Sequence, residues 1–191
     1  MGVEDVLPVV LGISVLSLVV AFVLARQVLA ADTGKPEMIA ISDAIREGAE
    51  AFLSRQYRTI GIFSVAAAAA IFGFYFANRE VKNIAEMGHG AAWKVTISFI
   101  TGALCSALAG YIGMFVSIRA NVRTAAAAMT SLNKALQIAL RGGAVSGLSV
   151  VSMSLLGVGG LFYLFDGMHD YHHVPLQIVG FGFGASFVAL F

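Results

Sequence analysis

Four long stretches of this sequence contain no acidic or basic side chain, and they constrain the fold more than any other feature. They are residues 6–25 and 59–78, with 20 residues each, and residues 95–118 and 142–165, with 24 each. An α-helix rises about 1.5 Å per residue, so about 20 residues cross the ~30 Å hydrocarbon core of a bilayer. Each stretch therefore predicts one complete transmembrane helix.

A fifth apolar stretch, residues 174–191, closes the sequence. It has 18 residues and follows His172 and His173, after which no charged side chain occurs. A helix of this length covers about 27 Å, which would leave the terminal carboxylate near or inside the bilayer without a basic residue to anchor it. We therefore expect a truncated fifth transmembrane helix rather than a natural terminus.

The composition supports the same class of protein. Apolar residues make up 59% of the 191 residues and charged residues 12%, whereas soluble domains have about 25% charged residues. The expected fold is an all-α integral membrane protein, with residues 1–191 as a single transmembrane domain fragment built as a helical bundle. Its surroundings would be the lipid bilayer, and we expect no nucleic-acid partner.

The first stretch is predicted to stay in the protein. It is preceded by MGVED, which is acidic where a secretory signal has basic residues, and its 20 residues exceed the usual apolar core of such a signal. We therefore interpret residues 6–25 as a retained transmembrane helix.

Basic residues are distributed unevenly between the connections. The connections after the first and third stretches hold nine: Arg26, Lys35, Arg46, Arg55, Arg58, Arg119, Arg123, Lys134 and Arg141. The opposite side holds three: Arg79, Lys82 and Lys94. Basic residues favour the cytoplasmic side, so the N-terminus is predicted to be extracytoplasmic. The short external loops favour a prokaryotic plasma membrane.

Small residues recur within the stretches at helical spacing. They are Gly102, Ser106 and Gly110 in the third, Gly143 and Gly147 in the fourth, and Gly180 and Gly184 in the fifth. Without Cβ atoms between them, helices in a membrane pack closely, so these residues predict helix contacts. The GFGFG sequence is interpreted in the same way, because a phosphate-binding glycine loop needs a preceding strand. Cys105 is expected to be a small core residue.

No catalytic arrangement is visible. None of the eleven acidic residues falls inside an uncharged stretch, although an intramembrane carboxylate is the usual mark of an ion path. One group before the fifth stretch, Asp166, His169, Asp170, His172 and His173, has spacings at which zinc binding is conceivable. A solvated external loop is the favoured interpretation, because Gly167 and Pro175 indicate irregular backbone. No metal ligand is therefore assigned.

Residues 36–58 predict an amphipathic cytoplasmic helix that leads into the second stretch. Pro36 suits a first helical position, and an apolar face that includes Ile41, Ile45 and Phe52 recurs at helical spacing. Arg46 and Glu50 are four residues apart on the other face and are expected to pair weakly.

Four sequence blocks, in order, carry a family resemblance. They are AISDAIREGAEAFLSRQYRTI, SFITGALCSALAGYIGMFVSIRANVRTAAAA, ALRGGAVSGLSVVSMSLLG and GFGFGASFVALF. Together they resemble the amino-terminal portion of the membrane-bound ion-translocating inorganic pyrophosphatases, from about residue 38 onward. The resemblance implies sixteen transmembrane helices per subunit, a homodimer, and a pump that couples hydrolysis of Mg²⁺-bound pyrophosphate to transport of H⁺ or Na⁺, with K⁺ as a possible further cofactor.

The resemblance also implies where the functional residues lie. The first four helices would be outer-ring helices and the fifth the first inner-ring helix, with the catalytic and substrate-binding residues expected beyond residue 191. Within this chain only Ser186 corresponds to a position on the ion path. The chain alone is therefore expected to be inactive. The alternative is a small polytopic membrane transporter or scaffold subunit without hydrolytic activity, or a channel or permease.

Overall fold

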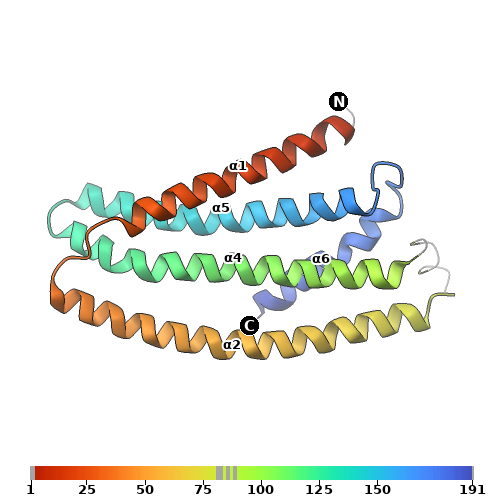
Figure 1. The fold of residues 1–191 in the computed structure, drawn as a ribbon, viewed down its shortest axis with the longest axis horizontal. Helices are drawn as coiled ribbons and strands as arrows, with labels where there is room; N and C mark the ends of the chain where they lie inside the picture. Colours follow the sequence, from red (N-terminus) through yellow and green to blue (C-terminus); the bar gives the residue numbers. More distant parts are fainter. Residues whose placement is uncertain (1–2, 81–83, 85–86, 88–89, 191) are drawn as a thin grey trace. The chain divides into compact units, whose positions relative to one another are not determined.

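The computed structural model describes residues 3–80, 84, 87 and 90–190. Five helices account for most of these residues: α1 (Val3–Leu29), α2 (Pro36–Ala77), α4 (Ala91–Ala128), α5 (Leu132–Leu164) and α6 (Val174–Ala189) (Figure 1). Within the described residues there is no β-strand. This confirms the all-α fold class. Phe191, the last residue of the predicted fifth helix, and Lys82, from the count of basic residues, lie outside the described residues.

Four of the helices are long and apolar enough to cross a membrane, and α6 is a shorter apolar helix of 16 residues. The prediction of four complete membrane helices and a shorter fifth is thus confirmed. The long helices extend beyond the uncharged stretches, since α4 has 38 residues and α5 has 33. The chain is part of an integral, multi-pass membrane protein.

The predicted amphipathic helix and the second membrane helix form one continuous helix. α2 runs for 42 residues, so at about 1.5 Å per residue it is roughly twice as long as the hydrocarbon core is thick. No proline or turn interrupts it after Pro36, which stands at its first position. About half of α2 must therefore project beyond the hydrocarbon.

Contacts between helices divide the chain into two compact units. The first unit comprises Met1–Ser14, Tyr57–Ala107 and Met153–Phe191, and the second comprises Val15–Gln56 and Leu108–Ser152. Each long helix thus contributes residues to both units, whereas α6 belongs to the first unit alone.

The first unit contains two apolar clusters. One brings α5 and α6 together through a set of buried side chains: Leu161, Phe165, Val174, Ile178 and Phe181. Cys105 of α4 is partly buried against this cluster, which agrees with its predicted role as a small core residue. The other cluster joins three helices through Ile60 of α2, Ala103 of α4 and Val188 of α6. α6 therefore packs against α5 in one cluster and against α2 and α4 in the other.

The second unit is built around the C-terminal parts of α1 and α4 and the N-terminal part of α5. Its buried cluster consists of Val28, Val116, Ala120 and Val145. Leu24, Phe115 and Ile138 pack against the cluster from the same three helices.

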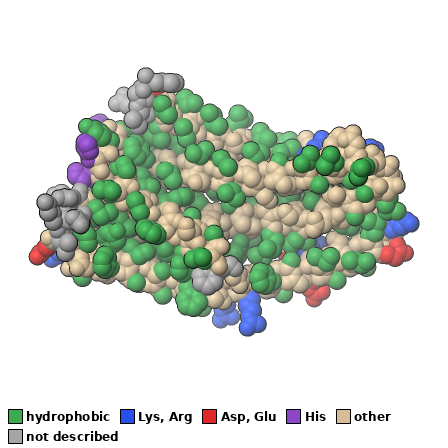
Figure 2. Space-filling view, turned by 180° about the vertical axis from the view of Figure 1, so that it is seen from behind, with side chains coloured by type: hydrophobic (Ala, Val, Ile, Leu, Met, Phe, Trp, Pro, Cys, Tyr) green, Lys and Arg blue, Asp and Glu red, His purple; other side chains and the backbone are tan. Residues whose placement is uncertain are grey.

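Large apolar side chains also cover much of the helical exterior. Phe22, Val65 and Leu16 are all more than 60% exposed, and Figure 2 shows apolar side chains along the helices on the face that it presents. An apolar surface of this kind suits hydrocarbon or further membrane helices and would be unfavourable in water.

Candidate functional site

A close helix contact in the first unit lies where α6 crosses α4 (Figure 1). A Cβ atom placed on Gly184 would overlap the backbone carbonyl of Phe99, and one on Gly180 would overlap that of Val95. From the other helix, a Cβ on Gly102 would overlap the carbonyl of Phe181. The prediction that these three glycines form helix contacts is therefore confirmed, and the contact is between backbones.

Glycines of the fourth stretch behave differently. Among the described residues, no atom of another helix lies within 4 Å of a Cβ placed on Gly143 or Gly147, so the prediction that they form a close helix contact is wrong within this part of the chain. The glycine of α5 that does contact α6 is Gly157, where the ring of Phe181 occupies the space of a missing side chain. Spacing alone does not distinguish these positions, because all three glycines recur within the same apolar helix.

Two polar side chains of the first unit donate hydrogen bonds to carbonyls that are distant in the sequence. Gln177 of α6 is 1% exposed, and its Nε2 donates a hydrogen bond to the carbonyl of Met87 at 2.6 Å. The hydroxyl of Tyr57 on α2 donates to the carbonyl of Ala107 on α4 at 2.9 Å. The donor and acceptor residues are 90 positions apart in the first bond and 50 positions apart in the second. Neither bond was predicted, because a pattern along the chain does not show which residues far apart in the sequence meet.

Ser186, the predicted ion-path residue, lies on the exposed side of α6. Its neighbours at helical spacing on that side are Leu176, Val179, Phe183 and Leu190, all exposed. Ser186 is thus the one hydroxyl-bearing residue in an otherwise apolar strip that faces away from the contacts with α4 and α5. Its role in an ion path stays a prediction.

The acidic and histidine group before α6 forms two separate pairs. His169 Nδ1 lies 2.7 Å from Asp166 Oδ1, and His173 Nδ1 lies 2.6 Å from Asp170 Oδ1. Asp166 has a positive φ of 63°, so the backbone here is irregular, as expected for a loop. The position of Pro175 differs from the prediction, because this residue lies in the first turn of α6 rather than in the loop. Proline is favoured there since the first helical N–H groups have no partner.

The pKa of the Asp170 carboxyl is lowered from its ordinary value. Desolvation raises it, but the side-chain and backbone hydrogen bonds from His173, with the charges of His173 and Lys94, outweigh that effect. Within the residues that the structure describes, no three His, Cys, Asp or Glu side chains are grouped so that they could hold a metal ion.

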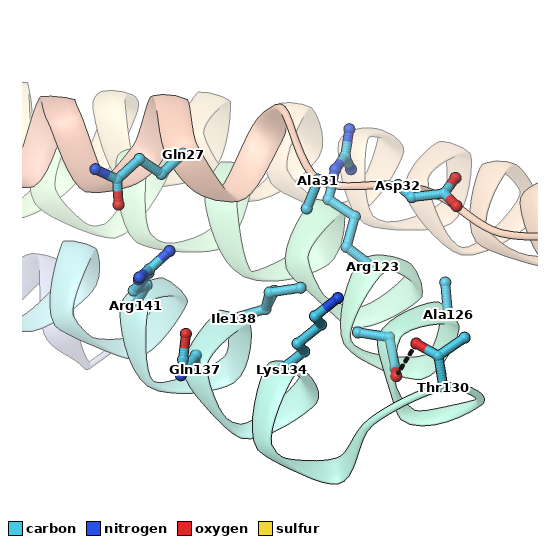
Figure 3. A pocket seen from close by; sticks show the side chains of 11 residues that line it. Gln27, Ala31, Asp32, Arg123, Ala126, Thr130, Lys134, Gln137, Ile138 and Arg141 are labelled. Atoms are coloured by element: carbon cyan, nitrogen blue, oxygen red, sulfur yellow. Dashed lines mark hydrogen bonds between the residues drawn. The ribbon is translucent and has the colours of Figure 1, made fainter.

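A basic pocket of about 390 Å³ lies in the second unit, between the end of α1, the end of α4 and the start of α5. Figure 3 shows Lys134 and Arg141 directed from α5 toward the C-terminal end of α1, with Arg123 entering from α4. Its other polar lining residues are Gln27, Asp32, Thr130 and Gln137.

Arg123 lines this pocket and forms hydrogen bonds to two backbone carbonyls. Its guanidinium donates to the carbonyl of Leu29 at 3.0 Å and to that of Arg119 at 2.7 Å. Leu29 is the last residue of α1, where backbone carbonyls lack helical partners, so a cation stabilises this helix end. The Nε atom of Arg123 is buried and has no hydrogen-bond partner among the described residues.

An ion-pair group joins α2 to α4 in the second unit. Arg46 lies 3.9 Å from Glu50, the weak pair expected from the sequence, and 3.3 Å from Asp43. Glu50 also lies 3.2 Å from Arg119 of α4, whose guanidinium stacks over the ring of Phe115 at 3.6 Å. The contact with Arg119 was missed, since the two residues are 69 positions apart.

The predicted apolar face of residues 36–58 is only partly covered by other residues. Ile41, Ile45 and Phe52 are all more than half exposed. Ile41 and Ile45 line a groove of about 280 Å³ with Ile118 and Val122 of α4. This part of α2 therefore lies beside α4 but leaves apolar surface uncovered.

Comparison with known proteins links these features to a family. The family model for "Inorganic H+ pyrophosphatase" matches residues 15–191. The chain is 49% identical over 187 residues to the "K(+)-insensitive pyrophosphate-energized proton pump 2" of Moorella thermoacetica, covering 98% of this chain and 25% of that protein. It is 45% identical to the "K(+)-insensitive pyrophosphate-energized proton pump" of Caldanaerobacter subterraneus, covering 97% of this chain and 26% of that protein.

A plant protein is similar too. The "Pyrophosphate-energized membrane proton pump 3" of Arabidopsis thaliana is 43% identical over 190 residues, which are 94% of this chain and 24% of that protein. The chain thus spans about a quarter of the length of the relatives that it matches. With a family match over nearly all of its residues, the chain belongs to the inorganic H⁺ pyrophosphatase family.

Proposed function

We propose that this chain supplies membrane helices to a pyrophosphate-energised ion pump, as the amino-terminal quarter of its subunit. The observation that carries the proposal is the family match over residues 15–191, together with 43–49% identity to three proton pumps. The similarity extends over 98% of this chain and so includes the helices of both units.

The proposed substrates are inorganic pyrophosphate and H⁺. The sequence left H⁺ and Na⁺ open, and the relatives, which are named as proton pumps, favour H⁺. Two of those names also include K⁺ insensitivity, so we propose that K⁺ is not required.

Magnesium is proposed as the counterion of pyrophosphate, but the described residues do not fit a magnesium site. Magnesium prefers carboxylate oxygens, and no group of three metal-ligating side chains exists within the described residues. We therefore assign no step of hydrolysis to these residues. Their proposed role is to form the membrane scaffold, with the exposed side of α6 that carries Ser186 facing the ion path.

The proposed topology follows from the basic residues. The connection between α1 and α2 and that between α4 and α5 would be cytoplasmic, and the N-terminus extracytoplasmic. A prokaryotic plasma membrane and a homodimeric pump remain part of the proposal. The exposed apolar side chains, among them Phe22 and Val65, support contacts with further membrane helices.

A chimeric pump tests the proposal. The matching quarter of the Moorella thermoacetica pump is replaced by this chain, and inverted membrane vesicles are assayed for phosphate release from pyrophosphate and for acidification. We expect both activities to be retained, because the helix contacts are supplied by a chain that is 49% identical. The parent pump and a chimera with Gly184→Leu serve as positive and negative controls.

A second experiment uses the 191-residue chain alone. We expect it to show no magnesium-dependent hydrolysis of pyrophosphate, because its described residues hold no metal-ligating group. A chimera that inserts as a stable protein yet neither hydrolyses pyrophosphate nor acidifies vesicles would contradict the proposed function, as would hydrolysis by the chain alone.

A further inference from the structure

The basic pocket of the second unit has a marked excess of positive charge. Arg123, Lys134 and Arg141 line it, against the single carboxylate of Asp32. Asp32 Oδ1 already accepts a hydrogen bond from the backbone N–H of Gly34 at 3.0 Å. None of the three cations lies within 4.0 Å of a carboxylate among the described residues, although Arg46 and Arg119 nearby in the same unit both do. Charges that converge without a counterion favour an anionic ligand.

The polar lining fits an anion with several acceptor oxygens. Lys134 and Arg141 are exposed and end in the pocket, and Gln27 and Gln137 add amide donors on either side (Figure 3). The guanidinium of Arg123 adds a third positive charge to the lining, and its buried Nε has no hydrogen-bond partner in the described part of the chain. Phosphate groups are recognised by such sets of arginine, lysine and amide donors.

The depth of the pocket indicates where that phosphate comes from. Arg141 directly precedes the uncharged stretch 142–165, and Arg123 lies five residues beyond stretch 95–118, about 7.5 Å along the helix. Polar headgroups occupy about 5–8 Å on each side of the hydrocarbon core. This spacing predicts that the two arginines lie at the level of phospholipid phosphates.

We propose that this pocket binds a phosphate group, supplied by an anionic phospholipid headgroup at the basic side of the membrane. The lipid would be held by its phosphate between α1 and α5 and would lie with its acyl chains along the apolar stretches. The inference requires only that the chain spans a membrane, so its failure would leave the proposed pump function untouched.

Native mass spectrometry of the 191-residue chain in neutral detergent tests the proposal. Dioctanoyl-phosphatidylglycerol is titrated as the anionic probe, with dioctanoyl-phosphatidylcholine, inorganic phosphate and pyrophosphate in parallel. The test variant is K134Q/R141Q. The matched control is K35Q/R46Q, which removes the same two charges from exposed positions of the same unit that do not line the pocket.

We expect K134Q/R141Q to bind phosphatidylglycerol about 30-fold more weakly, since each basic residue near an anionic headgroup contributes roughly a factor of five. The control should bind like the wild type, and phosphatidylcholine should bind weakly to all three. Asp32→Asn removes the one acidic charge without removing the acceptor for Gly34, so it should tighten binding. This variant keeps the test decisive if K134Q/R141Q does not fold.

The other outcomes are also informative. Binding of inorganic phosphate or pyrophosphate that is lost in K134Q/R141Q, with no such loss for phosphatidylglycerol, would support a phosphate site but assign it to a soluble anion. Equal losses in test and control variants would overturn the proposal, because they would indicate attraction to overall charge. Absence of any anion binding, or weaker binding by Asp32→Asn, would overturn it as well.

Discussion

Gly184 of α6 lies directly against the backbone carbonyl of Phe99 on α4, with no room for a Cβ atom between them. Gly180 makes the equivalent contact with Val95 one turn earlier. α6 is thus positioned by its backbone, and its side chains Val174, Phe181 and Val188 fill the space on either side.

Gly184→Ala is predicted to destabilise the first unit. The added methyl group meets rigid backbone rather than a movable side chain, so α6 must shift and lose packing, at a typical cost of about 1–3 kcal/mol. Fluorescence of Trp93, the single tryptophan, reports on this unit because its ring packs edge-on against Phe165. Thermal unfolding in detergent should show the lower transition temperature.

The matched control is Gly182→Ala, on the same helix. No atom that the structure describes outside this stretch of α6 lies within 4 Å of a Cβ there, so the helix should be unaffected or slightly stabilised by alanine's better helix propensity. Equal transition temperatures for the two variants would show that the backbone contact does not hold α6.

Tyr57→Phe is predicted to weaken the contact of α2 with α4. The variant keeps the ring but leaves the carbonyl of Ala107 without the hydroxyl that donates to it at 2.9 Å, a loss of about 0.5–1.5 kcal/mol. Tyr163→Phe is the control, since Tyr163 is 67% exposed. Chemical unfolding of both variants measures the difference, and a loss no larger for Tyr57→Phe than for the control would refute it.

The contact between Glu50 and Arg119 is predicted to contribute little and to depend on salt. Both side chains are partly or largely exposed, so the coupling free energy should be about 0.2–1 kcal/mol. A double-mutant cycle with Glu50→Gln and Arg119→Gln measures it, and Glu47→Gln controls for the charge of α2. Coupling that stays unchanged in 1 M salt would contradict the assignment as an exposed ion pair.

Acidification is predicted to weaken the turn before α6. Because the pKa of Asp170 is lowered from 3.8 in the folded chain, its contribution to stability is fully present above the ordinary value and is lost as the pH falls through the lowered one. Carboxyl NMR should give a titration midpoint for Asp170 below 3.8. His173→Gln should move that midpoint upward, whereas His172→Gln should not. A midpoint at or above 3.8 in the wild type would disprove the effect.

The sequence alone predicted the features that depend on local pattern. Residues 6–25 and 142–165 indicated membrane helices because hydropathy and helical length are properties of a continuous segment. The same reasoning placed the amphipathic segment 36–58 directly before the second membrane helix, and α2 contains both. The four ordered blocks pointed to the family for a related reason, since they are read along the chain.

Only the tertiary structure decided which of these residues meet. Gly143 and Gly184 look alike in sequence, yet only Gly184 contacts another backbone, because crossing points depend on how helices pack and not on the spacing within one helix. For the same reason Glu50 and Arg119, 69 residues apart, could not be paired in advance. The basic pocket likewise exists because the ends of α1 and α4 lie beside the start of α5, which brings Arg123 of α4 together with Lys134 and Arg141 of α5.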